Sequence, residues 1–351
     1  MQTSEKFLTY KLKNYFCKIF LVDKYHELIK IPLSLVDQIE EFMKLLLTGC
    51  TGFIGKELIP LLIKEGHSLT AISRQPREKL KLVASESELS IIQMNPVDSA
   101  SWNNEEIQNS LKNCDGIINL AGEPIAEKRW TEAHCKEIQN SRIETTKNLI
   151  STLSNLKKSP KVLINASAIG FYGSHSQTEF TEDNKPGDDF LANLCNEWET
   201  IAAKKPKATR LLIVRIGIVL AKDGGALGKM LPIFKAGLGG PIGDGKQWMS
   251  WIHRTDLCNL ICESLKNTSW SGVINGVSPN PVRMREFAYS LGKALGRPSL
   301  LAVPGPILKL ILGDGARVVL EGQNVRTQRF KKLKFEFIFP ELNDAFKSIL
   351  T

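Results

Sequence analysis

Short apolar runs alternate along this chain with longer segments in which apolar residues recur at helical spacing. The runs predict strands at residues 44–48, 68–73, 89–94, 116–120, 161–166, 209–215 and 271–277. The longer segments predict helices at residues 56–65, 130–156, 189–204, 256–266 and 283–296. Strands that alternate with helices indicate a parallel sheet covered on both faces, so the predicted fold class is α/β.

The composition of the chain changes after the sixth predicted strand. Residues 224–245 are rich in glycine and contain Pro232 and Pro241, which predicts a lobe or a lid. Thr255 is placed to cap the helix that follows it. Residues 304–351 are predicted to form a small, mostly helical lobe.

A glycine-rich loop at residues 49–55 (GCTGFIG) joins the first predicted strand to the first predicted helix. In this setting Gly49 permits the tight turn, Gly52 lets backbone approach a pyrophosphate, and Gly55 lets the helix pack close to the strand. Free N–H groups and the positive end of the helix dipole then face the phosphates. The loop therefore predicts binding of a dinucleotide.

The residues before this strand form a separate extension, residues 1–42. They hold six lysines and six acidic residues, and the apolar stretch at 16–22 is broken by Lys18. Transit peptides are basic and poor in acids, and signal peptides have an uninterrupted apolar core, so neither pattern fits. We expect either an upstream mis-assigned start codon or a loosely attached helix.

Composition places the chain among globular proteins. It has 351 residues, of which 42% are hydrophobic and 24% charged. Its strongest apolar run, 211–221, is interrupted by Arg215 and is shorter than the roughly 18 residues of a membrane span. The seven cysteines include no Cys-x-x-Cys pair, which predicts reduced thiols and a cytoplasmic location. Cys258 and Cys262 lack partner ligands, so they are interpreted as buried helix residues and no metal site is predicted.

The net charge of +9 has a local component near the C-terminus. The residues concerned are Arg326, Arg329, Lys331, Lys332 and Lys334. No nucleic-acid motif accompanies them, so they are interpreted as a solvated face and no nucleic-acid partner is predicted. A modest positive charge suits a protein that binds a polyphosphate cofactor.

The end of the second predicted strand indicates which cofactor binds. An acidic residue about 20 positions after such a loop would bind the ribose hydroxyls of NAD. Here the strand ends in Ser73 and Arg74, and no acid is present. An arginine fork matches the oxygens of a 2′-phosphate, so NADP(H) is predicted.

Two motifs, residues 48–55 (TGCTGFIG) and 119–122 (NLAG), resemble those of the extended short-chain dehydrogenase/reductases, the nucleotide-sugar epimerase group. More specifically, the chain resembles the atypical "epimerase family protein" subgroup, which is sometimes labelled cell-division-inhibitor-like. Supporting segments are 123–125 (EPI), 129–130 (RW), 141–142 (SR), 166–173 (ASAIGFYG), 237–243 (GLGGPIG), 251–253 (WIH) with Asp256, and 294–298 (ALGRP). The resemblance covers residues 43–351 and leaves out the first 42.

The resemblance implies a Rossmann fold, a doubly wound parallel sheet that binds NADP(H), with a smaller C-terminal substrate lobe. The expected parts are the extension at 1–42, a cofactor domain at 43–220 completed by parts of 251–278, and a lobe from 221–250 and 279–351. The implied cofactor residues are Gly49, Thr51, Gly52, Phe53, Ile54 and Gly55 at the pyrophosphate, Ser73 and Arg74 at the adenosine ribose phosphate, and Leu120, Ala121, Gly122 and Glu123 on the inner ribose side. Extended members often form dimers through two helices, here 130–156 and 189–204.

The catalytic residues depart from the usual pattern of a Ser, a Tyr and a Lys four residues after the Tyr. Ser167, after the fifth predicted strand, matches the serine. Leu191 takes the place of the tyrosine and Cys195 that of the lysine, and the atypical subgroup shares this loss. Neither side chain performs the usual proton transfer at neutral pH, although a Cys195 thiolate is chemically capable of it.

Other side chains offer partial substitutes. Tyr172 follows Ser167 by five residues and is the best alternative acid, against the interpretation of a structural tyrosine. His253 either faces the cleft or is a buried histidine bonded to backbone, and the buried interpretation is favoured. His175 lies in a polar loop and is expected to be exposed. Trp248 and Trp251 form either a platform for a ring substrate or part of the core.

Three functions follow from these residues. The first is an NADP(H)-dependent oxidoreductase or epimerase-like enzyme with a nonstandard active site that acts on an unidentified small molecule. The second is a non-catalytic NADP-binding regulator or scaffold, connected with cell division by the family label. The third, a nucleic-acid binder, depends on the basic C-terminal cluster alone and is the least favoured.

Overall fold

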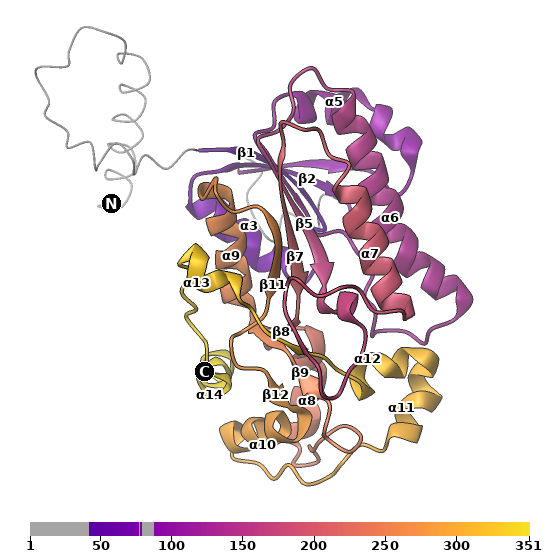
Figure 1. Cartoon of the computed structure of the whole chain (residues 1–351), viewed down its shortest axis with the longest axis vertical. Helices are drawn as coiled ribbons and strands as arrows, with labels where there is room; N and C mark the ends of the chain where they lie inside the picture. Colours follow the sequence, from indigo (N-terminus) through magenta and orange to yellow (C-terminus); the bar gives the residue numbers. More distant parts are fainter. Residues whose placement is uncertain (1–41, 77, 79–87) are drawn as a thin grey trace, which may run out of the picture. The chain divides into compact units, whose positions relative to one another are not determined.

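The computed structural model of the chain describes residues 42–76, 78 and 88–351, so the predictions for residues 1–41 lie outside the described part. Within it, seven parallel strands form one sheet in the order β11-β7-β5-β4-β1-β2-β3 (Figure 1). Their bounds are β1 (Lys44–Thr48), β2 (Ser68–Ser73), β3 (Leu89–Gln93), β4 (Gly116–Asn119), β5 (Val162–Ala168), β7 (Arg210–Ile216) and β11 (Gly272–Gly276). The strand order turns back between β1 and β4, which confirms the predicted doubly wound Rossmann fold.

Helices cover both faces of this sheet (Figure 1). On one face lie α3 (Gly55–Lys64) and α9 (Arg254–Lys266), and on the other α5 (Glu105–Lys112), α6 (Glu132–Ser154) and α7 (Phe190–Ala202). A short 3-10 turn, η1 (Ser99–Asn103), precedes α5.

Strand β1 illustrates how the sequence fills both layers of the core. Successive side chains of a strand point to opposite faces. Leu45 and Leu47 pack in the cluster that contains the apolar residues of α3 and α9. Leu46 packs in the cluster that contains those of α5 and α6. An uninterrupted apolar strand is therefore needed at this position of the sheet.

Most of the remaining described elements gather beyond one end of the sheet, whereas the helix at residues 329–333 lies beside α9 (Figure 1). Their helices are α8 (Gly225–Lys235), α10 (Met284–Leu295), α11 (Gly305–Leu312), α12 (Arg317–Leu320), α13 (Arg329–Leu333) and α14 (Leu342–Leu350), with 3-10 turns η2 (Ile169–Tyr172) and η3 (Gly313–Ala316). Three strand pairs join them: β8 (Ile218–Leu220) with β10 (Trp251–His253), β9 (Trp248–Met249) with β12 (Val282–Arg283), and β6 (Glu179–Phe180) with β13 (Asn324–Val325). A separate apolar cluster built around Trp251, Phe287 and Phe346 forms the core of this part.

Two local predictions need correction. Thr255 does not cap α9, because the helix begins at Arg254 and the Nδ1 atom of His253 accepts the N–H of Thr255 at 3.1 Å. Cap preferences favour small hydroxyl side chains, and a buried imidazole that takes the same role has no sequence signature. The glycine-rich segment 224–245 also contains the helix α8, which was not predicted.

The cysteine and charge predictions are partly confirmed. Cys258 and Cys262 are buried in α9, as expected. The basic cluster is not a purely solvated face, because Arg326 lies 3.1 Å from Glu179 and Arg329 donates to the carbonyl oxygen of Val273. The cluster's lysines 331, 332 and 334 are exposed. Among the described residues, no helix is both long and apolar enough to cross a membrane.

Candidate functional site

The glycine loop between β1 and α3 is shaped by two of its three glycines. Gly49 has φ +69°, and a Cβ atom there would lie 2.4 Å from the carbonyl oxygen of Leu120. A Cβ at Gly55 would lie 2.3 Å from the carbonyl oxygen of Cys50. Gly52 differs, because its Cβ would meet only the carbonyl oxygen of Gly49, at 3.1 Å. The turn and the helix packing thus require Gly49 and Gly55, and Gly52 borders open space.

The N-terminus of α3 fits an anionic group. Its N-cap residue, Ile54, makes no side-chain hydrogen bond to the first turn. The N–H groups of Lys56 and Glu57 in the first turn already donate to the carbonyl oxygens of Gly52 and Ile54, each at 3.1 Å, so an anion there is favoured mainly by the positive end of the helix dipole. Arg254 fixes the neighbouring Phe53, since its Nη1 donates to the Phe53 carbonyl oxygen at 3.2 Å and its guanidinium lies 4.7 Å from the ring centroid.

Buried polar side chains join the carboxyl ends of β1 and β4. Thr48 Oγ1 donates to Asn119 Oδ1 at 2.6 Å and accepts the N–H of Ala121 at 3.2 Å. Asn119 Nδ2 in turn donates to Asn165 Oδ1 at 2.7 Å on the next strand. Residues 120–123 are therefore held beside the glycine loop.

The structure brings the predicted ribose-phosphate residues to the same edge of the sheet. Arg74 follows β2 and Glu123 follows β4, and both strands pair with β1. Arg74 Nη2 lies 3.4 Å from Glu123 Oε2, and the Oγ of Ser73 accepts the N–H of Gln75 at 2.9 Å. The roles of these residues in cofactor binding stay predictions.

A buried ion pair lies behind the candidate catalytic serine. Ser167 Oγ donates to Glu199 Oε1 at 2.6 Å. Arg215 binds the same carboxylate through two bonds, Nε to Oε1 and Nη2 to Oε2, each 2.8 Å long. All three side chains are buried, so the guanidinium compensates a carboxylate that would otherwise be costly to remove from water.

Tyr172 belongs to the same network. Its hydroxyl donates to Asn275 Oδ1 at 2.6 Å and accepts from Arg215 Nη1 at 2.9 Å. Burial raises the pKa of this phenol above its usual value, although Arg215 opposes the shift. The ring stacks on Phe180 with centroids 5.2 Å apart. These contacts are those of a structural tyrosine, and its catalytic role stays a prediction.

The residues in the places of the usual Tyr and Lys differ in burial, since Leu191 is half-buried and Cys195 is buried. A Cβ at Gly170 would lie 3.3 Å from the Cβ of Leu191, which places this leucine against η2. Burial, reinforced by the charge of Glu199, raises the pKa of Cys195 to about 11. A raised pKa disfavours the thiolate at physiological pH, and the suggestion that a Cys195 thiolate transfers the proton stays a prediction.

The remaining candidate residues, two histidines and two tryptophans, lie in different surroundings. His253 is buried and packs on Phe339, with ring centroids 4.1 Å apart, and burial lowers its pKa to about 4, so the buried interpretation is confirmed. His175 is exposed, as expected. Trp251 is part of the apolar core. Trp248 lies under the guanidinium of Arg283, 3.8 Å from the ring centroid.

The sequence did not reveal the network partners Glu199, Arg215 and Asn275. Arg215 carried a usable signal, since it is a charge inside the longest apolar run and lies in a buried strand. Such a charge requires a buried partner. Nothing in the sequence points to which acid supplies it.

Comparison with known proteins identifies the family. Residues 45–275 match the model of the NAD-dependent epimerase/dehydratase family. The chain belongs to this family. Residues 303–349, which include α14, match a domain of unknown function, DUF1731.

Relatives of this family confirm the predicted subgroup. The chain is 42% identical over 315 residues to the epimerase family protein SDR39U1 homolog, chloroplastic, of Arabidopsis thaliana, covering 89% of this chain and 88% of the relative. The crystal structure of human epimerase family protein SDR39U1 with NADPH superposes with a TM-score of 0.78 at 37% identity, covering 88% of this chain and 99% of that chain. A nucleoside-diphosphate sugar epimerase from Corynebacterium glutamicum gives a TM-score of 0.66 at 26% identity, covering 89% of this chain and 59% of that chain.

Proposed function

We propose that this protein binds NADPH and acts as an oxidoreductase or epimerase-like enzyme on a small molecule. The observation that carries the proposal is Arg74, which stands beside the open glycine loop where an NAD-selective site would hold an acid. The human relative, 37% identical, was crystallised with NADPH, which supports the same cofactor here.

The proposed cofactor site uses three segments. Residues at the N-terminus of α3 and its loop would bind the pyrophosphate: Gly49, Thr51, Gly52, Phe53, Ile54 and Gly55. Ser73 and Arg74 would bind the adenosine ribose phosphate, and residues 120–123 would line the ribose. The bound cofactor supplies the hydride, and the chain supplies orientation and electrostatic support.

Two residues are proposed to serve the chemistry. Ser167 would contact the substrate, because it lies at the carboxyl end of β5 and its hydroxyl proton has an acceptor in Glu199. Tyr172 is the alternative acid, and Arg215 would stabilise its deprotonated form. We propose that residues 221–250 and 279–351 form the substrate lobe.

Cofactor titrations test the binding proposal. Arg74→Ala should lower NADPH affinity roughly tenfold to a hundredfold, because a charge-assisted bond to phosphate is lost. NADH affinity should stay nearly constant. Arg297→Ala, at an exposed position after α10, is the control for loss of a positive charge. An equal loss of affinity for both cofactors would contradict the 2′-phosphate assignment.

Activity is tested with NADPH and a small-molecule extract of the source cells. Wild-type protein should oxidise NADPH, and Gly52→Ala should oxidise it much more slowly at the same limiting NADPH concentration, since a Cβ there intrudes on the open side of the loop. Ser167→Ala should lower the turnover rate and retain NADPH affinity. The metabolite depleted from the extract would identify the substrate.

A second candidate is a non-catalytic NADPH-binding regulator or scaffold, with the connection to cell division that the subgroup label carries. Leu191 and the neutral thiol of Cys195 favour it, because neither replaces the usual acid–base pair. NADPH binding without consumption of any metabolite would support this candidate over the enzyme.

We further propose a homodimer and a cytoplasmic location. The helices α6 and α7 pack side by side and form an open groove lined by Ser151, Thr200 and Ile201 among others. The described cysteines are all free, in keeping with a reducing compartment. Relatives need not share that compartment, since the Arabidopsis protein is named chloroplastic.

A further inference from the structure

Three charged side chains meet beside the adenosine end of the proposed cofactor site. The Glu123 carboxylate lies between two cations, with Oε2 3.4 Å from Arg74 Nη2 and Oε1 3.5 Å from Lys128 Nζ. Arg74 and Glu123 follow the two strands that flank β1 and its glycine loop. The chain therefore holds an anion of its own where the sequence predicts the 2′-phosphate.

The three side chains differ in their access to water. The side chain of Glu123 is 19% exposed, whereas those of Arg74 and Lys128 are 59% and 61% exposed. The carboxylate is the covered centre of the cluster, and each cation keeps an open side. Exposed ion pairs contribute little stability and are screened by salt, so a ligand of higher charge can replace this carboxylate.

The backbone of Glu123 is held separately from its side chain. Its N–H donates to Ser141 Oγ at 2.9 Å, and its carbonyl oxygen accepts from Arg142 Nη2 at 3.0 Å. Both partners lie on α6. The carboxylate can therefore turn away from Arg74 while the loop after β4 keeps its place.

Lys128 has one further acidic neighbour. Its Nζ lies 3.9 Å from Oε2 of Glu137, a side chain that is 60% exposed. The same oxygen lies closer to His134 Nδ1, at 3.2 Å. This longer, solvated contact does not fix Lys128, so its ammonium group can move towards a phosphate.

We infer that the Glu123 carboxylate stands in for the cofactor 2′-phosphate in the cofactor-free protein, and that Lys128 is a second cation that binds this phosphate. The inference rests on the proposed NADPH function. A phosphate carries more charge and more acceptor oxygens than a carboxylate, so it can bridge an arginine fork and an ammonium group. NADH carries only a ribose hydroxyl at this position and gains nothing from the second cation.

Titrations of the whole chain with NADPH, NADH and adenosine 2′,5′-bisphosphate test the inference. Lys128→Gln should lower affinity for the two 2′-phosphate ligands roughly five- to tenfold and leave NADH within about twofold. Glu123→Gln should raise affinity for the same two ligands roughly three- to tenfold, because the competing carboxylate is removed. The effect of Lys128→Gln should shrink at high salt.

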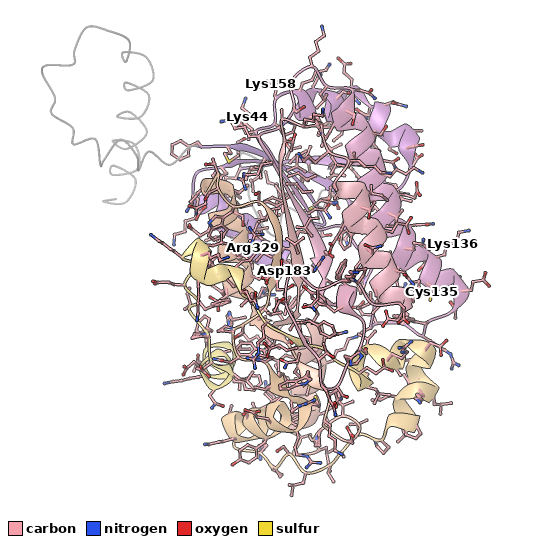
Figure 2. The ribbon with its side chains drawn as sticks, in the orientation of Figure 1. Lys44, Cys135, Lys136, Lys158, Asp183 and Arg329 are labelled. Carbon is pink, nitrogen blue, oxygen red and sulfur yellow. The ribbon has the colours of Figure 1, made fainter. Side chains whose placement is uncertain are left out.

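Lys136→Gln is the matched control, since it removes one positive charge from an exposed position on α6 (Figure 2). It should leave all three affinities unchanged. The inference would be overturned if Lys128→Gln changed the affinity for the 2′-phosphate ligands no more than Lys136→Gln does. It would also be overturned if Glu123→Gln bound NADPH more weakly than wild type. Wild-type protein that binds NADPH no better than NADH would instead overturn the proposed function, so the two failures are distinct.

Discussion

At the scale of single residues, the pair formed by Glu199 and Arg215 is the most consequential feature. The two side chains are only 9% and 4% exposed, and their charged atoms are 2.8 Å apart. Such a pair adds little net stability compared with apolar residues, but the loss of one partner leaves an uncompensated buried charge. Ser167 and Tyr172 depend on it for their positions.

Removal of one partner should therefore be severe. Arg215→Met should lower the free energy of unfolding by about 3–5 kcal/mol, measured by urea denaturation. The double variant Arg215→Met with Glu199→Gln should recover part of that loss, because no unpaired charge remains. Equal free energies of unfolding for the single and double variants would show that the unpaired Glu199 carboxylate does not destabilise the protein.

His253 gives the protein a defined response to acid. Its pKa is about 4 in the folded chain, against 6.5 for the free side chain, because burial opposes the charged form. Between these values the unfolded chain binds a proton that the folded chain does not, so stability falls as pH decreases from 6.5 towards 4. At pH values well above 6.5 the His253 imidazole is neutral in both the folded and the unfolded chain, so it no longer makes stability depend on pH.

This response is measurable against a variant that keeps the cap. His253→Asn retains an acceptor for the Thr255 N–H and does not titrate. Between pH 7 and 5 the wild type should lose about 2 kcal/mol more unfolding free energy than His253→Asn. Parallel pH profiles of the two proteins would contradict the lowered pKa.

At the scale of elements, the unit β1–loop–α3 combines packing with binding. Gly49 and Gly55 each place a would-be Cβ within 2.4 Å of backbone, whereas Gly52 does not. Conformation and close packing thus account for two glycines without any ligand. Gly52 is therefore the glycine for which we predict a role in cofactor binding rather than in folding.

A pair of matched substitutions should separate these roles. Gly55→Ala should lower the free energy of unfolding by several kcal/mol, because the Cys50 carbonyl must shift to make room for the new Cβ. The loss should appear as a clearly lower midpoint of thermal unfolding. Gly52→Ala should stay within about 1 kcal/mol of wild type and lose at least tenfold in NADPH affinity. Similar melting curves for both variants would refute this division.

At the scale of the whole described chain, residues 123–131 connect the part that carries the seven-stranded sheet to the C-terminal elements. Lys229 Nζ on α8 donates to the Ala126 carbonyl oxygen at 2.7 Å. Arg129 Nη1 donates to the Leu310 carbonyl oxygen at 2.9 Å, and Trp130 N–H to that of Leu312 at 3.1 Å. The loop that carries Glu123 and Lys128 therefore also contacts α8 and α11.

The proposed homodimer can be tested with the whole protein. The groove between α6 and α7 carries Glu144, Lys147, Glu197 and Lys204, an alternation of charge that can pair with itself across a two-fold axis. Light scattering should give twice the chain mass of 39.1 kDa for wild type. Ser151→Arg should return the monomer mass, and Ser348→Arg, exposed on α14, should not. A monomeric wild type would refute the proposed dimer.

Most elements were predictable because their signals are local. The apolar run at β1, the glycine loop and the following amphipathic segment each depend on neighbours in sequence, and β2 was placed with its observed bounds, Ser68–Ser73. The cap of α9 was misplaced because the preference for Thr255 ignores a buried imidazole. The short strands of the C-terminal part were missed because they are set by pairing partners far along the chain.

The sequence by itself determined the α/β fold and the glycine loop, since periodicity and backbone conformation specify them, and it predicts Arg74 as the residue that selects NADPH. Only the tertiary structure decided that Glu199 pairs with Arg215 and Ser167, that burial raises the pKa of Cys195, and that Glu123 lies between Arg74 and Lys128. These depend on which strand ends and helix faces meet and how far water is excluded. Contacts across dozens of residues and local burial are properties of the folded chain, and no local pattern encodes them.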